Sequence, residues 1–570
     1  MLAWTIYISF IGVAVLTLLP RDNAQAARKT ALLTALAGLL VALASAVHYK
    51  TGSEIVTVTK LPWIRSLGID YHLGADGISM TLVLLTGIAS VVGILFSWNI
   101  EHRAKEFFAL YLALIGGVYG VFISFDLFLL FVFYELAIVP KYFLIAIWGS
   151  TRKEYGAMKL VIYSLVGSGM VLIGLIAAYV VAGAKTTSLI ELAKFPFPEN
   201  FQMWAFPLVF VGFAILAGLW PFHTWAPTGH VAAPTAASML LAGVVMKLGA
   251  YGCLRVAMTL FPQGMMGQWG IQNDFWLHFR TFFDHSFIEQ IQILLHLIGF
   301  GSWRDVFSVM AGIGIVYGAM VALVQKDFKF VVGYSSVSHM GFVLLGLMTL
   351  NEIGMSGAVL QMFSHGIIAS LLFAVVGRMV YDRTHTRDFT DLERMQLNKA
   401  MPFAAVTFVV AGLASMGMPG FSGFVAELQV IIGAWKAFPT FAVLAGLGIL
   451  VGVAYTLRAV RKAFYGDTES PVGSVVSRPP DRKTDQPALA FSNGPVISHA
   501  TKAGYPFATN QGRDENQHTL EPISIPERIG AVILMATTLV IGLYPRLLLD
   551  LIMPALNSTL MSHVLKGGNP

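Results

Sequence analysis

The chain has 570 residues, of which 56% are hydrophobic and only 12% are charged. An ordinary soluble domain has about 25% charged residues, so this composition excludes a soluble globular protein. The net charge of +6 does not indicate nucleic-acid binding, because the Lys and Arg residues stand mostly in short loops between apolar segments and not in one patch.

Long apolar segments follow one another along the chain. A membrane-spanning helix needs about 20 apolar residues, and in lipid its backbone polar groups must pair internally. The segments lie near residues 2–20, 30–48, 78–98, 107–124, 126–149, 158–182, 205–220, 236–258, 306–325, 330–350, 354–381, 401–437, 440–464 and 528–552. They lack the alternation of β-barrel strands. We predict an all-α polytopic membrane protein with about fourteen transmembrane helices, the first retained and not a cleaved signal peptide.

Basic residues are distributed unevenly between the two sides of the predicted bundle. If every segment crosses once and the N-terminus lies outside, the loops and helix ends on one side receive Arg21, Arg28, Lys29, Arg103, Lys105, Arg152, Lys153, Lys159, Lys326, Lys329, Arg383, Arg387, Arg458, Arg461 and Lys462. Short loops rich in Lys and Arg stay in the cytoplasm. We therefore expect that side to face the cytoplasm, in a bacterial inner membrane.

Two of the segments contain breaks. Trp220-Pro221 opens a Pro-rich stretch, and Met418-Pro419-Gly420 interrupts the segment 401–437. Proline frees backbone carbonyls and kinks a helix, so either break alone is equally compatible with an ordinary kink. Interrupted helices at corresponding places of two halves are typical of transporters built from inverted repeats. We predict such repeats over 107–260 and 306–465.

The segments outside the repeats complete the predicted organisation. They are N-terminal transmembrane helices over 1–106, an outer-side loop over 261–305, a polar cytoplasmic loop over 466–526 and a C-terminal transmembrane helix with its tail over 527–570. The outer-side loop contains Trp269, Trp276, Phe283 and Trp303 among polar residues, which is typical of a membrane interface. The cytoplasmic loop is rich in Pro, Ser, Gly, Asp and Asn, so we expect largely irregular structure there.

A few charged residues stand inside the apolar segments, where a charge costs at least about 2.5 to 3.5 kcal/mol. They are Glu135, Lys141, Lys247 and Glu427, with Lys329 near the end of a segment. We interpret Glu135, Lys247 and Glu427 as functional, since a buried acid or amine can bind and release a proton when its neighbours change. Position alone favours an ordinary boundary lysine for Lys329. For Lys141, position alone does not decide between two roles. The residue is either a second partner of Glu135 or a lysine whose side chain reaches to the membrane interface.

Histidines also lie within or beside these segments. His339 and His365 are predicted in neighbouring helices, where imidazole can bridge two lysines as a proton relay near neutral pH. A lone buried histidine is more often a packing residue, but two together favour the relay. His223 and His230 flank the first break near the cytoplasmic side and are weaker candidates for admitting protons.

The sequence contains no recognisable phosphate-binding P-loop, dinucleotide-binding fingerprint or metal-ligand cluster. The single cysteine, Cys253, excludes an internal disulfide and an iron–sulfur cluster ligated by several cysteines of this chain. We therefore expect no cofactor in this chain. The energy for transport must come from an ion gradient or from a partner.

Four stretches carry a resemblance to a known family. They are Trp220-Pro221-Phe222-His223-Thr224-Trp225, Ala233-Pro234-Thr235-Ala236, Leu241-Ala242-Gly243 with Lys247, and Tyr334-Ser335-Ser336-Val337-Ser338-His339-Met340-Gly341. They resemble the antiporter-like subunits of respiratory complex I and the Mrp-type cation/proton antiporters, over residues of about 70 to 465. Glu135 in its sequence context, His385-Thr386-Arg387-Asp388 and Glu427 are similar to the chain-4 (NuoM) branch. The other two antiporter-like subunits typically have lysine at that last position.

The resemblance implies a proton channel. In it Glu135 pairs with and modulates Lys247, the residues Lys329, His339 and His365 carry the proton laterally, and Glu427 releases it outward. It also implies a subunit of an NADH:quinone oxidoreductase translocase that has no redox site of its own and depends on quinone reduction elsewhere. Partner subunits would bind NADH, FMN, iron–sulfur clusters and quinone. Within the bilayer, the partners would be other membrane-arm subunits, especially the two other antiporter-like ones.

The sequence departs from the family pattern at two positions and in two loops. Lys141 stands where an apolar residue is usual and offers Glu135 a second partner, Thr228 replaces an expected acidic residue, and the loops 262–305 and 466–526 are longer than usual. Two alternatives stay open. One is a Mrp-type Na+/H+ antiporter or membrane-bound hydrogenase subunit, and the other is a structural membrane-arm subunit that does not pump.

Overall fold

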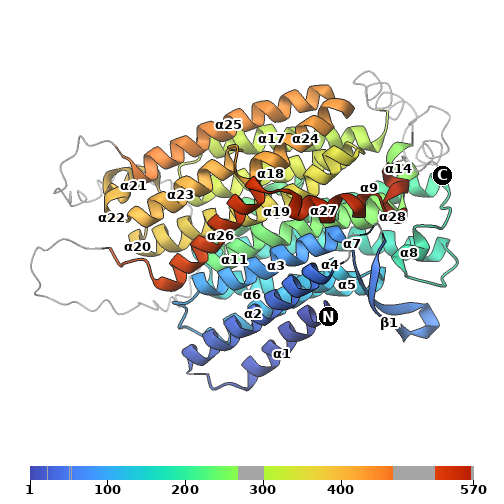
Figure 1. Ribbon diagram of the computed structural model, residues 1–570, viewed down its shortest axis with the longest axis horizontal. Coiled ribbons are helices and arrows are strands. Elements are labelled where there is room, and N and C mark those ends of the chain that lie inside the picture. The colour runs from blue at the N-terminus through green and yellow to red at the C-terminus, as the bar shows by residue number, and fades with distance from the viewer. Residues whose placement is uncertain (22, 50–51, 53, 268–300, 467–519, 566–570) are drawn as a thin grey trace, which may run out of the picture.

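The chain folds into a bundle of long helices that run side by side (Figure 1). The computed structural model describes residues 1–21, 23–49, 52, 54–267, 301–466 and 520–565. Within them, twelve helices are long and apolar enough to cross a membrane, and Trp4–Leu18 and Pro402–Ser415 are shorter apolar helices. Every predicted apolar segment overlaps one of these helices. The protein is therefore a multi-pass membrane protein, as the sequence predicts.

The N-terminal part combines helices with a small hairpin that the sequence analysis missed. It contains α1 (Trp4–Leu18), α2 (Ala24–His48), β1 (Val56–Ile64), the short turn η1 (Arg65–Leu67), β2 (Ile69–Ala75) and α3 (Gly77–Phe96). The strands pair antiparallel, and Gly68 completes the turn with a φ of 65° that favours glycine. The signal for the hairpin is the alternation Val-Thr-Val-Thr at 56–59.

The predicted first repeat, 107–260, corresponds to a series of helices and turns that begins with α4. It contains α4 (Ala104–Ile123), α5 (Leu127–Leu136), α6 (Ile138–Trp148), α7 (Lys153–Val181), α8 (Leu189–Leu192), α9 (Glu199–Ala217), η2 (Phe222–Thr224), α10 (Trp225–Ala232), α11 (Thr235–Leu240), η3 (Leu241–Val245), α12 (Met246–Gly252), η4 (Cys253–Ala257) and α13 (Met258–Leu260). The segments η3 and η4 are π-helical turns within one continuous crossing.

The second repeat follows the short α14 (Pro262–Met266). It contains α17 (Trp303–Val324), α18 (Phe328–Met348), α19 (Glu352–Phe373), the π-helical η5 (Ala374–Tyr381), α20 (Asp382–Thr384), α21 (Phe389–Leu392), η6 (Glu393–Met395), α22 (Leu397–Ala400), α23 (Pro402–Ser415), α24 (Ser422–Ala437) and α25 (Pro439–Phe464). The predicted interfacial residues Trp269, Trp276 and Phe283 lie outside the described residues, whereas Trp303 begins α17 and donates to the Met203 carbonyl at 2.8 Å.

A matching pair of backbone bridges relates the two repeats with opposite orientation. Asp126, which caps α5, bridges to Ser188 before α8, and Asp327, which caps α18, bridges to Asp388 before α21. The corresponding hydrogen bonds run from Leu127 N–H to Thr187 O (2.9 Å), from Leu189 N–H to Phe125 O (2.9 Å), from Phe328 N–H to Arg387 O (2.8 Å) and from Phe389 N–H to Lys326 O (3.1 Å). In Figure 1, α8 and α21 lie at opposite ends of the bundle, so the second repeat is inverted.

Both predicted breaks are present, one in each repeat. The helix α9 ends before Gly218 and α23 ends before Gly417, and both glycines adopt the left-handed backbone, with φ of 86° and 68°. A glycine in this conformation ends a helix at little cost because it has no Cβ. The chain resumes as α10 after the first break and as α24 after the second. Each repeat therefore contains one interrupted crossing.

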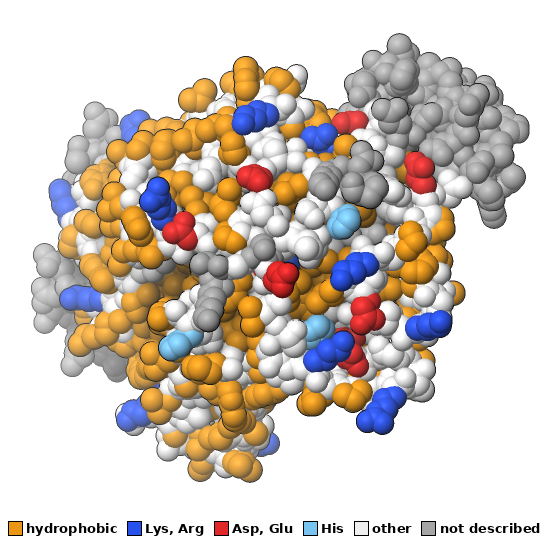
Figure 2. Space-filling model, turned by 45° about the vertical axis from the view of Figure 1, so that its right-hand side comes forward, with side chains coloured by type: hydrophobic (Ala, Val, Ile, Leu, Met, Phe, Trp, Pro, Cys, Tyr) orange, Lys and Arg blue, Asp and Glu red, His pale blue; other side chains and the backbone are white. Residues whose placement is uncertain are grey.

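The most deeply buried helices form the centre of the bundle. The crossings α11–α13 and α19 are enclosed along their whole apolar length, and α3 and α18 almost so, whereas α2, α25 and α26 are largely exposed. The exposed positions carry large apolar side chains, among them Leu18 and Val47. Figure 2 shows hydrophobic side chains spread over much of one face of the molecule. A lipid environment accounts for this surface.

The C-terminal apolar segment is interrupted, contrary to the prediction of one helix over 528–552. It forms α26 (Ile525–Leu543) and α27 (Arg546–Leu556), followed by α28 (Thr559–Leu565). Pro545 follows α26 and cannot continue its hydrogen-bond ladder, which explains the interruption. Most of the predicted polar loop 466–526 lies outside the described residues.

The loops that carry the predicted cytoplasmic arginines and lysines all meet at one end of the bundle, which we call the inner end; it is the end that carries α20, α21 and α22 in Figure 1. We predict that Glu101→Cys, an exposed position at this end, reacts with a membrane-impermeant maleimide in inverted vesicles, and that exposed Lys185→Cys at the outer end does not. Cys253 is fully buried and gives little background. The opposite labelling pattern would reverse the assigned orientation.

Candidate functional site

The centre of the site is Lys247, which lies in α12 between the π-helical turns η3 and η4. Its side chain has no exposed surface. Its Nζ donates a hydrogen bond to the Ala242 carbonyl at 2.5 Å and lies 2.8 Å from Nδ1 of His365 on α19. π-Helical turns are frequent at functional sites because they reposition side chains and loosen the local hydrogen-bond ladder. Lys247 and His365 are therefore close enough to exchange a proton directly.

A second histidine, His339, lies between His365 and the break in the second repeat. Lys247, His365 and His339 thus begin a line of buried titratable groups. The rings of His365 and His339 lie 5.3 Å apart, centre to centre. Nδ1 of His339 lies 3.0 Å from Oε1 of Glu427 on α24, and its Nε2 lies 3.2 Å from the Ser415 hydroxyl at the end of α23. Gln361 donates to the same carboxylate oxygen at 3.2 Å. The imidazole of His339 thus bridges the two halves of the interrupted crossing.

The glycine of this break makes room for Glu427. A Cβ on Gly417 would lie 2.8 Å from Oε2 of Glu427, and the backbone at Gly417 is left-handed. Any larger residue there would collide with the carboxylate as well as strain the backbone. The break thus holds an acid inside the bundle, next to His339.

Lys329 joins the line at the inner end. It stands in the first turn of α18, and its Nζ donates to the carbonyl oxygens of Ala233 at 2.6 Å and Val231 at 3.2 Å. These carbonyls lie at the C-terminal end of α10, where the helix dipole favours a cation. Lys329 of the second repeat therefore binds the broken helix of the first repeat, and it is buried.

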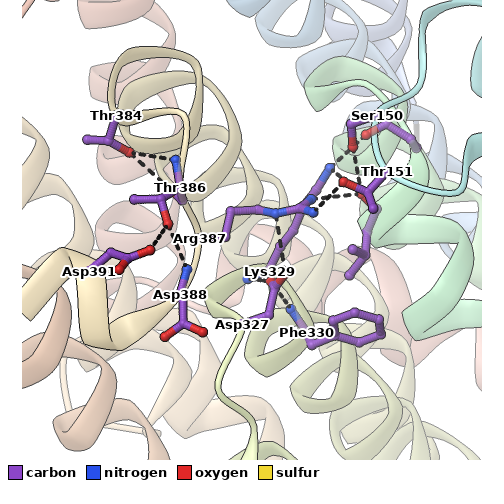
Figure 3. A network of polar contacts seen from close by, with 12 residues as sticks. Ser150, Thr151, Asp327, Lys329, Phe330, Thr384, Thr386, Arg387, Asp388 and Asp391 are labelled. Atoms are coloured by element: carbon purple, nitrogen blue, oxygen red, sulfur yellow. Dashed lines mark hydrogen bonds and ion pairs between the residues drawn. The ribbon is translucent and has the colours of Figure 1, made fainter. Parts of the chain in front are cut away.

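Arg387 fixes the same junction from the side (Figure 3). Its guanidinium lies 3.3 Å from the Asp327 carboxylate and donates to the Val231 carbonyl and the Thr151 hydroxyl, both at 3.2 Å. Asp388 next to it accepts hydrogen bonds from the Thr390 hydroxyl and backbone N–H, and these bonds hold the pKa of Asp388 below its usual range. The inner end of the site is thus a fixed ionic framework.

His230 is a further buried titratable group in the neighbourhood of the two lysines. It lies in α10, is fully buried, and neither ring nitrogen has a hydrogen-bond partner among the described residues. Lys329 and Lys247 are both close enough for their charges to act on this ring. The order of groups is then Lys329, His230, Lys247, His365, His339 and Glu427. The sequence analysis gave His230 only a minor role, although its place beside the first break was a usable signal.

Glu135 and Lys141 lie apart from this line. The expected pairing of Glu135 with Lys247 is wrong: among the described residues, Oε1 of Glu135 has no hydrogen-bond partner, and Lys247 contacts Ala242 and His365. Lys141 does not reach the interface but is 1% exposed, without a partner for its Nζ in the described part of the chain. The charge of Glu135 acts on Lys141 across the helix interruption at Ala137. Glu135 and Lys141 are thus an acid and an amine about two helical turns apart, and no hydrogen bond among the described residues holds Oε1 of Glu135 or Nζ of Lys141.

His223 is buried but belongs to another cluster. Its ring packs against Tyr317 at 5.2 Å and Tyr334 at 6.5 Å. Neither ring nitrogen has a hydrogen-bond partner in the described residues. The structure therefore places His223 beside the line and not within it.

The sequence analysis also missed a buried ion pair toward the outer end. Arg255 of η4 contacts the carboxylate of Asp76, and neither side chain has exposed surface. Asp76 in turn caps α3 by accepting from the Ser79 N–H at 2.9 Å. Arg255 stands inside the apolar segment 236–258, so the criterion that found Lys247 also applied to it. The pair joins the start of α3 to the crossing that carries Lys247.

Comparisons with known proteins agree with this arrangement. Residues 124–279 and 286–452 match the transmembrane family of the NADH:quinone oxidoreductases and Mrp antiporters. The chain is 33% identical to NAD(P)H-quinone oxidoreductase chain 4-2 of Synechocystis over 77% of this chain and 73% of the relative. It is 32% identical to NADH-quinone oxidoreductase subunit M of Rhodobacter capsulatus over 81% and 85%.

Solved structures share the fold. Respiratory complex I from Thermus thermophilus contains a chain with a TM-score of 0.77 and 24% identity, and the match covers 100% of both chains. The Mrp complex from Dietzia contains one with a TM-score of 0.75 and 21% identity, covering 99% of both. Both neighbours are multi-subunit membrane complexes.

The Asp76–Arg255 pair generates a stability prediction. Arg255→Ala leaves the Asp76 carboxylate buried without its partner, which typically costs about 3 to 5 kcal/mol. We expect the full-length chain in detergent to expose Cys253 to a thiol-reactive dye at a clearly lower temperature than wild type. The control Arg394→Ala removes an exposed arginine and leaves that temperature unchanged. Equal unfolding temperatures for wild type and Arg255→Ala would show that the pair does not stabilise the bundle.

Proposed function

The chain belongs to the transmembrane family of the NADH:quinone oxidoreductases and Mrp antiporters, and we propose that it is the chain-4-type proton-translocating membrane subunit of an NADH:quinone oxidoreductase in a bacterial inner membrane. The observation that carries the proposal is the line of buried titratable groups from Lys329 through Lys247 to Glu427. Charged groups inside a membrane bundle are costly and typically mark an ion or proton pathway. The names of the bacterial relatives supply the type of complex.

The proton moves between neighbouring groups in the order in which they lie. The Lys247 ammonium gives a proton to Nδ1 of His365 at 2.8 Å, and the neutral amine that remains is reloaded from the inner end through His230. His365 passes its proton to His339, which delivers it to Glu427 at 3.0 Å. Glu427 releases the proton toward the outer side, and its carboxylate is then ready for the next one. The steps from Lys247 to His365 and from His365 to His339 each move a positive charge to the next group, and the step from His339 to Glu427 leaves both groups neutral. The groups therefore titrate as a coupled set.

The energy must enter the line from outside this chain. Moving one charge against 100 mV requires about 2.3 kcal/mol, and one pKa unit corresponds to about 1.4 kcal/mol. A change of about two units at one lysine is therefore sufficient. The unfixed pair of Glu135 and Lys141 is suited to transmit such a change, because a neighbouring charge can move its proton without breaking a fixed ion pair.

Partner subunits complete the enzyme. The chain works within a membrane complex, next to other membrane-arm subunits and especially the two other antiporter-like subunits. Those parts of the enzyme that lie outside this chain bind NADH, FMN, the iron–sulfur clusters and quinone, and the reduction of quinone drives the pump. This chain contributes the proton path alone.

A Mrp-type antiporter or membrane-bound hydrogenase subunit is the second candidate. The fold of the Dietzia Mrp complex matches nearly as well as that of complex I. Purification with flavin and iron–sulfur proteins supports the oxidoreductase, small Mrp partners support the antiporter, and a nickel–iron protein supports the hydrogenase. The relatives at 32% and 33% identity favour the oxidoreductase.

Lys247→Ala tests the proposed function. Without the amine, His365 has no donor, so we expect proton pumping per NADH oxidised to fall at least tenfold in inverted vesicles, with the complex still assembled. The matched control Lys185→Ala removes an exposed lysine and leaves pumping unchanged. Normal pumping by assembled Lys247→Ala complexes would mean that the line is inert and the subunit structural.

A further inference from the structure

A cavity opens at the inner end of the bundle, directly beside Lys329. It has a volume of about 270 Å³ and lies between the end of α3, the loop after α6, the loop from α10 to α11, the start of α18 and the end of η5. Lys329 lines it together with Ala233, whose carbonyl oxygen binds the Lys329 ammonium at 2.6 Å. The cavity therefore reaches Lys329, the first group of the line that runs through His230, Lys247, His365 and His339 to Glu427, which we call the proton line.

The lining contains both apolar and polar residues and includes one acid. The side chains of Ser97, Asn99, Ser150, Thr235 and Tyr381 line the cavity, and the only charged residues among its described lining are Lys329 and Asp382. Water occupies about 30 Å³ in the liquid and needs two to four polar partners, so a cavity of this size has room for several molecules beside its polar side chains. Asn99 is exposed and Asp382 is 32% exposed, so the acid stands on the solvent side and the lysine on the buried side.

Asp382 is held in this place by a framework outside the proton line. Nη1 of Arg378 donates to its carboxylate at 3.1 Å. Arg378 also donates through Nε to the buried Glu527 at 2.8 Å, and Glu527 receives a second bond, of 2.8 Å, from Arg383. Glu527 belongs to the first turn of α26, so the C-terminal helix braces Arg378. Arg378 thus forms ion pairs with two acids, the buried Glu527 and Asp382 at the cavity.

We propose that this cavity is the proton intake of the subunit and that Asp382 is the group that collects protons for Lys329. The inference rests on the proposed function, since it supplies the line that begins at Lys329. Asp382 and Lys329 lie close enough for their charges to act on each other. No family motif used above includes Asp382; the cavity and the exposure of its carboxylate single it out.

The chemistry of the intake is a balanced proton transfer. The Asp382 carboxylate takes a proton from water of the inner aqueous phase. The carboxyl O–H passes that proton through water in the cavity to the neutral amine of Lys329, which becomes an ammonium, and the carboxylate is restored. The carbonyls of Val231 and Ala233 stabilise the new charge. The charge of Lys329 acts on His230, the following group of the line.

The test uses the complete enzyme in inverted vesicles, where the inner end faces the medium. Asp382→Asn is expected to lower proton pumping several-fold at high pH and less at low pH, because a collecting acid matters most when protons are scarce. Asp382→Glu is expected to restore most of the pumping, since it keeps the acid. Ser97→Leu, which fills the cavity, is expected to lower pumping in the same pH-dependent way. The control Asp391→Asn removes an exposed acid on the same connection, bonded to Thr386 at 2.8 Å, and leaves pumping unchanged.

The outcomes separate the intake from the proposed function. If Lys247→Ala abolishes pumping while Asp382→Asn pumps like wild type at every pH, the intake is wrong and the proton line stands. A loss in Asp382→Asn that is equal at all pH values and is not restored by Asp382→Glu overturns the intake as well, since Asp382 then only completes the ion pair with Arg378. If Lys247→Ala pumps normally, the proposed function fails, and the intake fails with it.

Discussion

The burial of Lys247 is the constraint on which the rest of this structure depends. An amine enclosed by helices at membrane depth has no bulk water to stabilise its charge, so its surroundings must supply both a bond to the ammonium and a path for the proton. The Ala242 carbonyl provides the first, and Nδ1 of His365 at 2.8 Å provides the second. π-Helical turns lie on both sides of α12, and the crossings that carry Lys247 and His365 are completely enclosed.

The inverted repeats bring the remaining groups to this centre. Each repeat breaks one crossing at a left-handed glycine, and a titratable residue of the second repeat binds the helix that follows the first break or lies in the second break. The C-terminal carbonyls of α10, the helix that follows the first break, bind Lys329, and Glu427 lies at the second break beside His339. The two junctions lie at the ends of one line, so a proton entering at the inner end has a chain of acids and bases to follow through the bundle. Because the two repeats are inverted, one break lies toward each side of the membrane.

Much of this could be predicted from sequence, for a physical reason. Transmembrane segments, both breaks and the charges at Glu135, Lys247 and Glu427 follow from hydropathy and from the cost of burying charge. Contacts between distant segments do not follow from either. The partner of Lys247 proved to be His365 and not Glu135, and His230 and the Asp76–Arg255 pair depend on which helices pack together. The break before α27 was missed because a long apolar segment hides a short turn, and the hairpin at 56–75 was missed although it lies between two apolar segments and shows an alternating pattern.

The central claim is that a proton arriving from Lys247 protonates Glu427 during turnover. Infrared difference spectroscopy of the complete enzyme during NADH oxidation measures this directly, through the carbonyl stretching band of a protonated carboxyl group. The account predicts a band that disappears in Glu427→Gln and also in Lys247→Ala, which retains the carboxylate but cannot load it. A band that persists unchanged in Lys247→Ala, or the same spectrum in wild type and Glu427→Gln, would contradict the account.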